Sequence, residues 1–148
     1  MVVSNSLGSV TSNNATLTVT STPPGSELIL NGGFESGATS WTGTTASIGT
    51  WTAEPARTGT KNAWLMGNGK TTTATQYDKF YVRVRNSAGT TLATLATYSN
   101  LNKATGYSLK TFDLSAYKGQ TIQVYFYGTE DSSLQTSFVI DDVSVKIN

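Results

Sequence analysis

The sequence contains no cysteine and no histidine. Without cysteine the chain has no disulfides, no thiolate nucleophile and no Cys-based zinc site. Without histidine it lacks the side chain that most often serves as a general base and as a transition-metal ligand. Acid–base chemistry would therefore rest on nine Asp and Glu residues, the lysines and the tyrosines. We expect a protein that is not an enzyme.

One adjacent pair of carboxylates is a candidate for catalysis. Glu130 and Asp131 lie in a short polar segment between two expected strands. A glycosidase needs two carboxylates that flank the scissile bond, whereas neighbours in sequence usually point apart. We interpret this segment as a solvated connection.

Charge is also scarce. Lys and Arg number 10, Asp and Glu number 9, and only 13% of the residues are charged, about half the usual share. A net charge of +1 gives no electrostatic reason to expect nucleic acid or anionic lipid as a partner. No apolar run is long enough to span a membrane. The neutral, hydroxyl-rich composition suggests an extracellular or cell-surface location, with any export signal outside these residues.

Helix-forming segments are nearly absent, and short runs of Val, Ile, Thr, Tyr and Phe alternate with Gly, Asn, Asp and Ser. Such spacing is typical of an all-β sandwich or jelly-roll. The expected strands cover residues 28–30, 63–66, 78–85, 90–98, 107–114, 121–127 and 136–147. Two of them alternate sharply, with Phe80, Val82, Val84 and Ile122, Val124, Phe126 predicted to face the core.

The first 26 residues have a different character. Residues 21–26 include two consecutive prolines and predict a linker. Before it, the segments 2–10 and 15–19 resemble the last two strands of a bacterial immunoglobulin-like domain. The sequence thus predicts a hairpin remnant over 1–20, a linker over 21–26 and a binding domain over 27–148.

Two motifs stand at opposite ends of this main domain. One is Asn31-Gly32-Gly33-Phe34-Glu35, with Trp41 following, and the other is the closing segment 138–145, which contains Asp141-Asp142. Together they resemble the opening and closing strands of galactose-binding-like jelly-rolls, a group that includes many carbohydrate-binding modules of bacterial extracellular proteins. The resemblance covers residues 27–148 and implies a two-sheet antiparallel jelly-roll sandwich whose first and last strands are neighbours.

The resemblance also implies a structural calcium ion. Its ligands would be Glu35, Asp141 or Asp142, and carbonyl oxygens near the turn at Asn31. Calcium takes six to eight hard oxygen ligands, which makes carboxylates from both ends of a chain a sensible site. The alternative is that Glu35 caps a turn and that one of the aspartates accepts backbone hydrogen bonds.

A second candidate site lies on the faces of two strands that point away from the core. Sugar rings bind to flat aromatic faces with a few planar polar groups beside them. If the strands are neighbours, their outward side chains form a platform for a glycan or polysaccharide. Alternatively, the tyrosines are cross-strand pairs that support an exposed sheet. The platform residues are Tyr81, Arg83, Arg85, Gln123, Tyr125 and Tyr127.

The three tryptophans differ in their expected positions. Trp41 belongs to the family pattern and is predicted to lie in the core. Trp51 follows a Gly- and Thr-rich stretch and is the candidate for an exposed, ligand-binding aromatic. Trp64 alternates with Ala63 and Leu65 and is expected to face away from the core.

The segment 66–78 is shorter than the resemblance leads us to expect, by about two strands. A jelly-roll without them has an exposed sheet edge, which invites pairing with another copy or a neighbouring domain. Two functions are favoured over catalysis. One is a non-catalytic glycan-binding module of a secreted multidomain protein, and the other is a structural or adhesive β-domain that mediates protein contacts without binding sugar.

Overall fold

The computed structural model describes residues 2–5, 8–11, 25–44, 47–65, 75–129 and 136–147, with the backbone alone for 2–5 and 8–11. The described chain is all-β, and its only helical elements with assigned bounds are two short 3-10 turns, η2 (Asn100–Asn102) and η3 (Ser115–Tyr117). It divides into two compact units, residues 1–28 with 145–148 and residues 29–144. No helix in the described part is long and apolar enough to cross a membrane.

The first unit contains a small antiparallel hairpin. Strand β1 (Val2–Asn5) pairs with β2 (Gly8–Thr11). The expectation of one strand over 2–10 is therefore wrong, because the chain reverses direction within that segment. Its expected partner, 15–19, and most of the linker lie outside the described residues.

The same unit joins the start and the end of the main domain's sequence. Glu27 forms an isolated antiparallel bridge with Lys146, and the Leu28 amide donates to the Val145 carbonyl at 2.8 Å. The strand expected over 28–30 is reduced to this bridge. The chain turns at residues 30–33, so the pairing does not continue through the segment 28–30.

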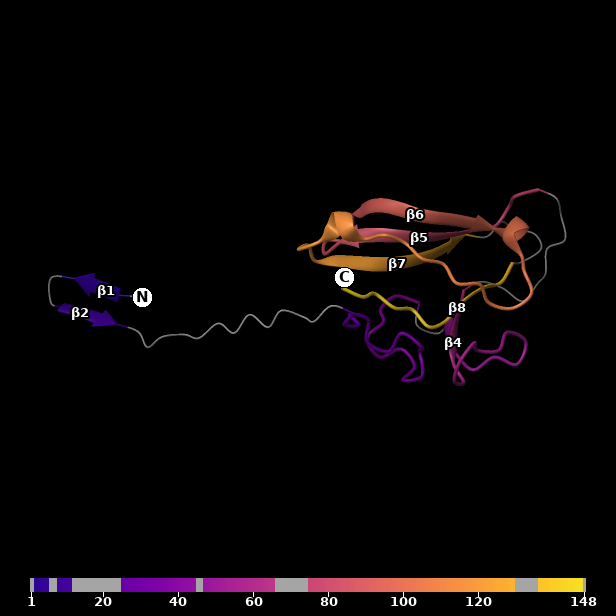
Figure 1. Cartoon of the computed structure of the whole chain (residues 1–148), viewed down its shortest axis with the longest axis horizontal. Coiled ribbons are helices and arrows are strands. Elements are labelled where there is room, and N and C mark those ends of the chain that lie inside the picture. Colours follow the sequence, from indigo (N-terminus) through magenta and orange to yellow (C-terminus); the bar gives the residue numbers. More distant parts are fainter. Residues whose placement is uncertain are drawn as a thin grey trace. The chain divides into compact units, whose positions relative to one another are not determined.

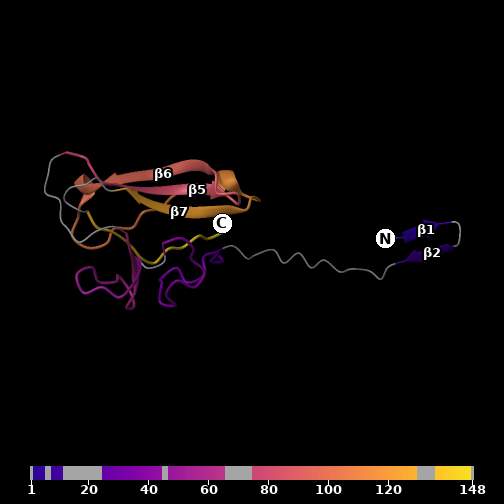
Figure 2. The same cartoon turned by 180° about the vertical axis from the view of Figure 1, so that it is seen from behind.

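The second unit contains two three-stranded antiparallel sheets. One has the order β3-β4-β8, comprising β3 (Ile48–Gly49), β4 (Asn62–Leu65) and β8 (Phe138–Ile140). The other has the order β6-β5-β7, comprising β6 (Thr91–Ser99), β5 (Lys79–Asn86) and β7 (Ile122–Thr129). Both views of the molecule show the second sheet as a continuous layer with β5 at its centre (Figures 1 and 2).

Strand β5 buries every second side chain, as its sequence predicts. Phe80, Val82 and Val84 are at most 7% exposed, and the residues between them are partly exposed. The pairing with β7 places Val82 opposite Phe126 and Val84 opposite Val124. The period of two therefore assigns the core face of this sheet correctly.

Aromatic side chains fill the space between the two sheets. The Phe80 ring lies 5.5 Å from the ring of Phe138 on β8 and 6.0 Å from that of Phe126 on β7. Trp41 packs on Phe34 at 4.9 Å and on Phe126 at 6.3 Å, which agrees with its expected place in the core. These contacts make the second unit an antiparallel β-sandwich, since two sheets share one layer of buried side chains.

The strand expected over 107–114 is not formed. Its alternation would place Tyr107 and Leu109 on one buried face, yet they are 37% and 91% exposed. The Tyr107 hydroxyl instead donates to the Pro55 carbonyl at 3.0 Å and accepts from the Asn62 side chain at 3.0 Å. Burial raises the pKa of this hydroxyl. Alternation alone was misleading here because the segment has no sheet partner.

The opening turn and the closing segment meet within the second unit, as the resemblance implies. The Val143 amide donates to the Gly32 carbonyl at 2.9 Å. A Cβ atom on Gly32 would lie 1.9 Å from the Val143 carbonyl oxygen. Only glycine allows so close an approach of the two backbones.

Candidate functional site

The expected platform is assembled on one face of the β6-β5-β7 sheet. The register places Tyr81 opposite Tyr127, Arg83 opposite Tyr125 and Arg85 opposite Gln123. The two strands are therefore direct neighbours, and the outward side chains of both share one face. We call these six residues the aromatic platform.

The rings of the aromatic platform stack on one another. Tyr127 lies 6.0 Å from Tyr81 across the strands and 6.0 Å from Tyr125 along its own strand, with interplanar angles of 24° and 15°. Tyr127 is 39% exposed, while Tyr81 and Tyr125 are half-buried. The three rings are therefore nearly parallel to one another, and the Tyr127 ring belongs to the most exposed of the three residues.

Both arginines of the platform lie over tyrosine rings. The guanidinium carbon of Arg83 is 4.4 Å from the ring centroid of Tyr81 and 5.4 Å from that of Tyr127. The guanidinium carbon of Arg85 is 3.9 Å from the ring centroid of Tyr125. These distances are within the range of cation–π attraction, which holds the planar groups against the aromatic surface.

A row of threonines on β6 extends the platform, and sequence reasoning missed it. Thr97, Thr94 and Thr91 are exposed and pair with Tyr81, Arg83 and Arg85. Two register shifts, after Val82 and after Val84, each insert an extra β6 residue.

The signal for this row was present in the sequence. Residues 91–97 repeat Thr-Leu-Ala with a period of three, and one bulge per repeat brings every third residue to the same face. A search for strict alternation cannot recognise this pattern.

Trp51 lies apart from the aromatic platform. Its ring packs edge-on against Trp64 of β4, with centroids 5.2 Å apart, and a Cβ atom on Gly49 of β3 would lie 3.1 Å from it. Neither indole N–H has a hydrogen-bond partner among the described residues. The pair thus belongs to the β3-β4-β8 sheet, and Trp51 adds no aromatic surface to the other sheet's platform.

The residues expected to bind calcium gather around one loop, residues 57–61. Glu35 accepts hydrogen bonds from the amides of Thr60 and Lys61 at 2.8 and 2.7 Å and from the Thr60 hydroxyl at 3.0 Å. Lys61 Nζ donates to the Glu35 carbonyl at 3.0 Å. These hydrogen bonds lower the pKa of Glu35, the Lys61 amide having the largest effect.

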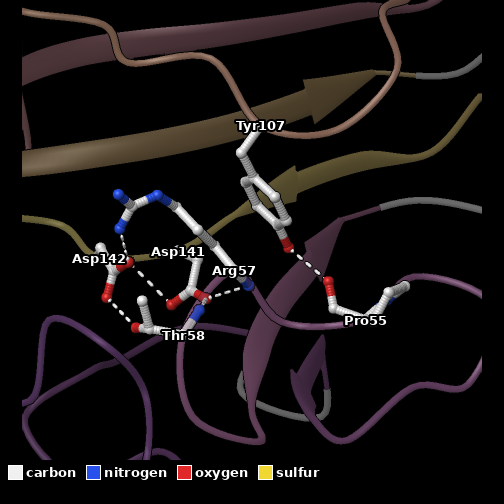
Figure 3. Close-up of polar contacts among 6 residues, drawn as sticks. All are labelled: Pro55, Arg57, Thr58, Tyr107, Asp141 and Asp142. Atoms are coloured by element: carbon white, nitrogen blue, oxygen red, sulfur yellow. Dashed lines mark hydrogen bonds and ion pairs between the residues drawn. The ribbon is translucent and has the colours of Figure 1, made fainter.

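The closing segment binds the other half of the same loop (Figure 3). Asp141 accepts from the amides of Arg57 and Thr58 at 2.8 and 3.2 Å. Asp142 forms an ion pair with Arg57 and accepts from the Thr58 hydroxyl at 2.6 Å. The hydrogen bond from Thr58 contributes most to lowering the pKa of Asp142, with a smaller effect from Arg57.

Both aspartates reach the loop because the strand alternation breaks between them. Asp142 has a φ of 53°, in the left-handed region that Asp tolerates better than most residues. In a regular strand, adjacent side chains point to opposite faces. The left-handed turn lets the two consecutive carboxylates bind one loop.

Asn31 organises the turn that precedes Glu35. Its side-chain amide donates to the carbonyls of Gly37 and Thr39 at 2.9 and 2.8 Å and accepts from the Ser36 amide at 2.9 Å. Trp41 donates its indole N–H to the Asn31 carbonyl at 2.9 Å. The side-chain amide of Asn31 therefore holds the turn, and its backbone carbonyl binds the Trp41 indole.

The groups that surround the three carboxylates are hydrogen-bond donors, and this arrangement does not fit a calcium ion. The groups facing Glu35, Asp141 and Asp142 are amide N–H groups, threonine hydroxyls and the Arg57 guanidinium. Calcium needs six to eight oxygen ligands. No group of three or more acidic, His or Cys side chains within the described ranges is placed to hold a metal. Calcium therefore stays a prediction from the resemblance.

Comparison with known proteins gives no further assignment. No family model, no curated protein and no solved structure matches this chain. What the geometry defines is the class, an antiparallel β-sandwich with an aromatic and guanidinium surface on one sheet.

Proposed function

We propose that this protein is a non-catalytic glycan-binding module and that the aromatic platform is its binding surface. The observation that supports this most directly is the alignment of three stacked tyrosines with two arginines across β5 and β7. The C–H face of a pyranose ring is apolar and matches a flat aromatic surface, and planar polar groups beside it can bind the hydroxyls.

The neighbouring threonines support the same proposal. Thr97, Thr94 and Thr91 are exposed and lie opposite Tyr81, Arg83 and Arg85. Each hydroxyl can both donate and accept a hydrogen bond, which suits a ligand rich in hydroxyl groups. A module of this kind would act in a secreted protein or at a cell surface, in keeping with the neutral, hydroxyl-rich composition.

The alternative is a structural or adhesive domain in which the tyrosines only support the sheet. A glycan array separates the two functions. We expect saturable binding of a polysaccharide by the wild-type chain and its loss in a Tyr125→Ala/Tyr127→Ala variant. Tyr77→Ala is the matched control, because Tyr77 is 47% exposed and lies outside the platform. A folded wild-type protein that binds no glycan on the array would overturn the proposal.

The calcium ion is a separate prediction that the glycan proposal does not require. Its test is the melting temperature measured in chelator and in added calcium. A higher melting temperature in calcium would confirm the ion and would require loop 57–61 to turn oxygen atoms toward Glu35. An equal melting temperature in both conditions would show that N–H donors satisfy the carboxylates.

A further inference from the structure

The face that carries the aromatic platform is positively charged. Strand β5 directs Lys79, Arg83 and Arg85 to the same side, since they alternate with the buried Phe80, Val82 and Val84. Strands β5, β6 and β7 contain no Asp or Glu. A chain with a net charge of only +1 thus concentrates three positive charges on one strand face.

The two arginines have no acidic partner in the described part of the chain. Arg83 and Arg85 contact tyrosine rings, but no hydrogen bond or ion pair joins either side chain to another described residue, and both Nε atoms are buried without a partner. By contrast, Arg57 pairs with Asp142. No described acceptor is bonded to the terminal N–H groups of either guanidinium, and an anionic ligand can supply one.

A carboxylate is the anion that fits this arrangement. The guanidinium group presents its N–H donors in a planar fork that matches the two oxygens of a carboxylate. The stacked tyrosines hold that fork against the surface on which a sugar ring would lie. A ligand that satisfies both features carries its carboxylate on the sugar ring itself.

From these observations we infer that the platform selects acidic polysaccharides whose rings carry carboxylates, that is, uronic-acid glycans. Arg83 and Arg85 bind the carboxylates, and Tyr125 and Tyr127 stack against the rings. This inference rests on the proposed glycan-binding function and adds to it the chemical class of the ligand.

The test uses acidic glycans and their neutral counterparts. Isothermal titration calorimetry of the full chain, in chelator and at low salt, compares oligogalacturonate with its methyl ester and oligoalginate with its carboxyl-reduced form. We expect the acidic member of at least one pair to bind roughly tenfold or more tightly than its neutral partner. Its affinity should fall as sodium chloride is raised, because salt screens exposed charges.

The arginines are tested with a charge-matched pair of variants. Arg83→Gln/Arg85→Gln should abolish the preference for the acidic glycan. Lys103→Gln/Lys118→Gln removes the same charge from exposed residues outside the platform and should keep the preference. Melting curves of both variants establish that they are folded.

Each outcome decides between the two proposals. Equal affinity for acidic and neutral members, or a preference that survives in the arginine variant, overturns the acidic selectivity but leaves the glycan-binding function in place. Failure of all acidic probes, with binding of neutral glycans on the array, also overturns the selectivity alone. Absence of binding to acidic and neutral glycans alike overturns both.

Discussion

The guanidinium carbon of Arg85 lies 3.9 Å from the ring centroid of Tyr125, across two neighbouring antiparallel strands. The contact joins a cation and an aromatic ring that are forty residues apart in sequence. It depends on the register between β5 and β7, since a slip of one residue would send the platform side chains of the slipped strand to the other face. The binding surface is therefore a direct consequence of strand pairing.

The tyrosine rings, rather than their hydroxyls, should provide most of the binding energy. We expect Tyr125→Ala to weaken glycan binding by roughly tenfold or more, since truncation of a central aromatic anchor usually costs more than 1 kcal/mol. Tyr125→Phe keeps the stacking surface and should retain most of the affinity. Titration calorimetry with the best glycan from the array measures both. Equal losses in the two variants would assign the effect to the hydroxyl.

The sandwich should depend strongly on Phe80. This side chain is 7% exposed and contacts aromatic rings of both sheets, so Phe80→Ala should lower the free energy of unfolding by about 3–5 kcal/mol. Leu109→Ala is the control, because Leu109 is 91% exposed and its removal should change stability by less than about 0.5 kcal/mol. Urea denaturation followed by tryptophan fluorescence measures both. Similar stabilities of the two variants would contradict the described core.

Much of this fold could be predicted from the sequence. Strands β4 to β7 were located within one or two residues, because alternation, turn residues and length agreed in each case. One exception was 107–114, where alternation exists without a described sheet partner and Leu109 is left exposed. Pairing is a long-range property, so a local pattern cannot reveal whether a partner strand is available.

The candidate sites, like the fold, could be predicted only in part. The outward face of β5 and β7 followed from their period, and their adjacency was an assumption that the register confirms. Asp141 accepts backbone hydrogen bonds, as one of the two alternatives predicted. The loop that supplies the partners, 57–61, was not predicted, because it has no periodic pattern and amide N–H groups are carried by every residue except proline. The left-handed Asp142 also has no signature in the sequence.

Gly32 should be required for joining the two ends of the domain. In Gly32→Ala the new Cβ atom would lie 1.9 Å from the Val143 carbonyl oxygen, so the backbones must separate. We expect a loss of about 1–3 kcal/mol in the free energy of unfolding, as for other overpacked sites. Gly33→Ala is a close control, because its nearest contact would be 3.4 Å away. A melting temperature unchanged in Gly32→Ala would contradict the close approach.

Stability should fall at acid pH through the carboxylates that hold loop 57–61. Hydrogen bonds lower the pKa of Glu35 and of Asp142 from their ordinary values of 4.5 and 3.8. A lowered folded-state pKa stabilises the protein above the unfolded-state value, and this stabilisation is lost as the pH falls through the folded-state value. The free energy of unfolding should therefore decrease as the pH falls below about 4.5.

The contribution of Glu35 is isolated by substitution. Glu35→Gln removes the titrating group, so the decrease in stability at acid pH should be shallower than in the wild type. Asp113 also has a lowered pKa, owing to hydrogen bonds from Ser115, and Asp113→Asn is the matched control for a carboxylate outside the loop. Identical pH profiles for wild type and Glu35→Gln would show that the Glu35 contacts do not stabilise the folded state.

The most direct test of the glycan-binding surface is an NMR titration of the ¹⁵N-labelled chain with a glycan that binds on the array. If the platform is the site, the largest amide shifts will follow β5 and β7 around Tyr81, Arg83, Arg85, Tyr125 and Tyr127. Saturating shifts confined to the β3-β4-β8 sheet around Trp51 and Trp64, with the platform unchanged, would contradict the account.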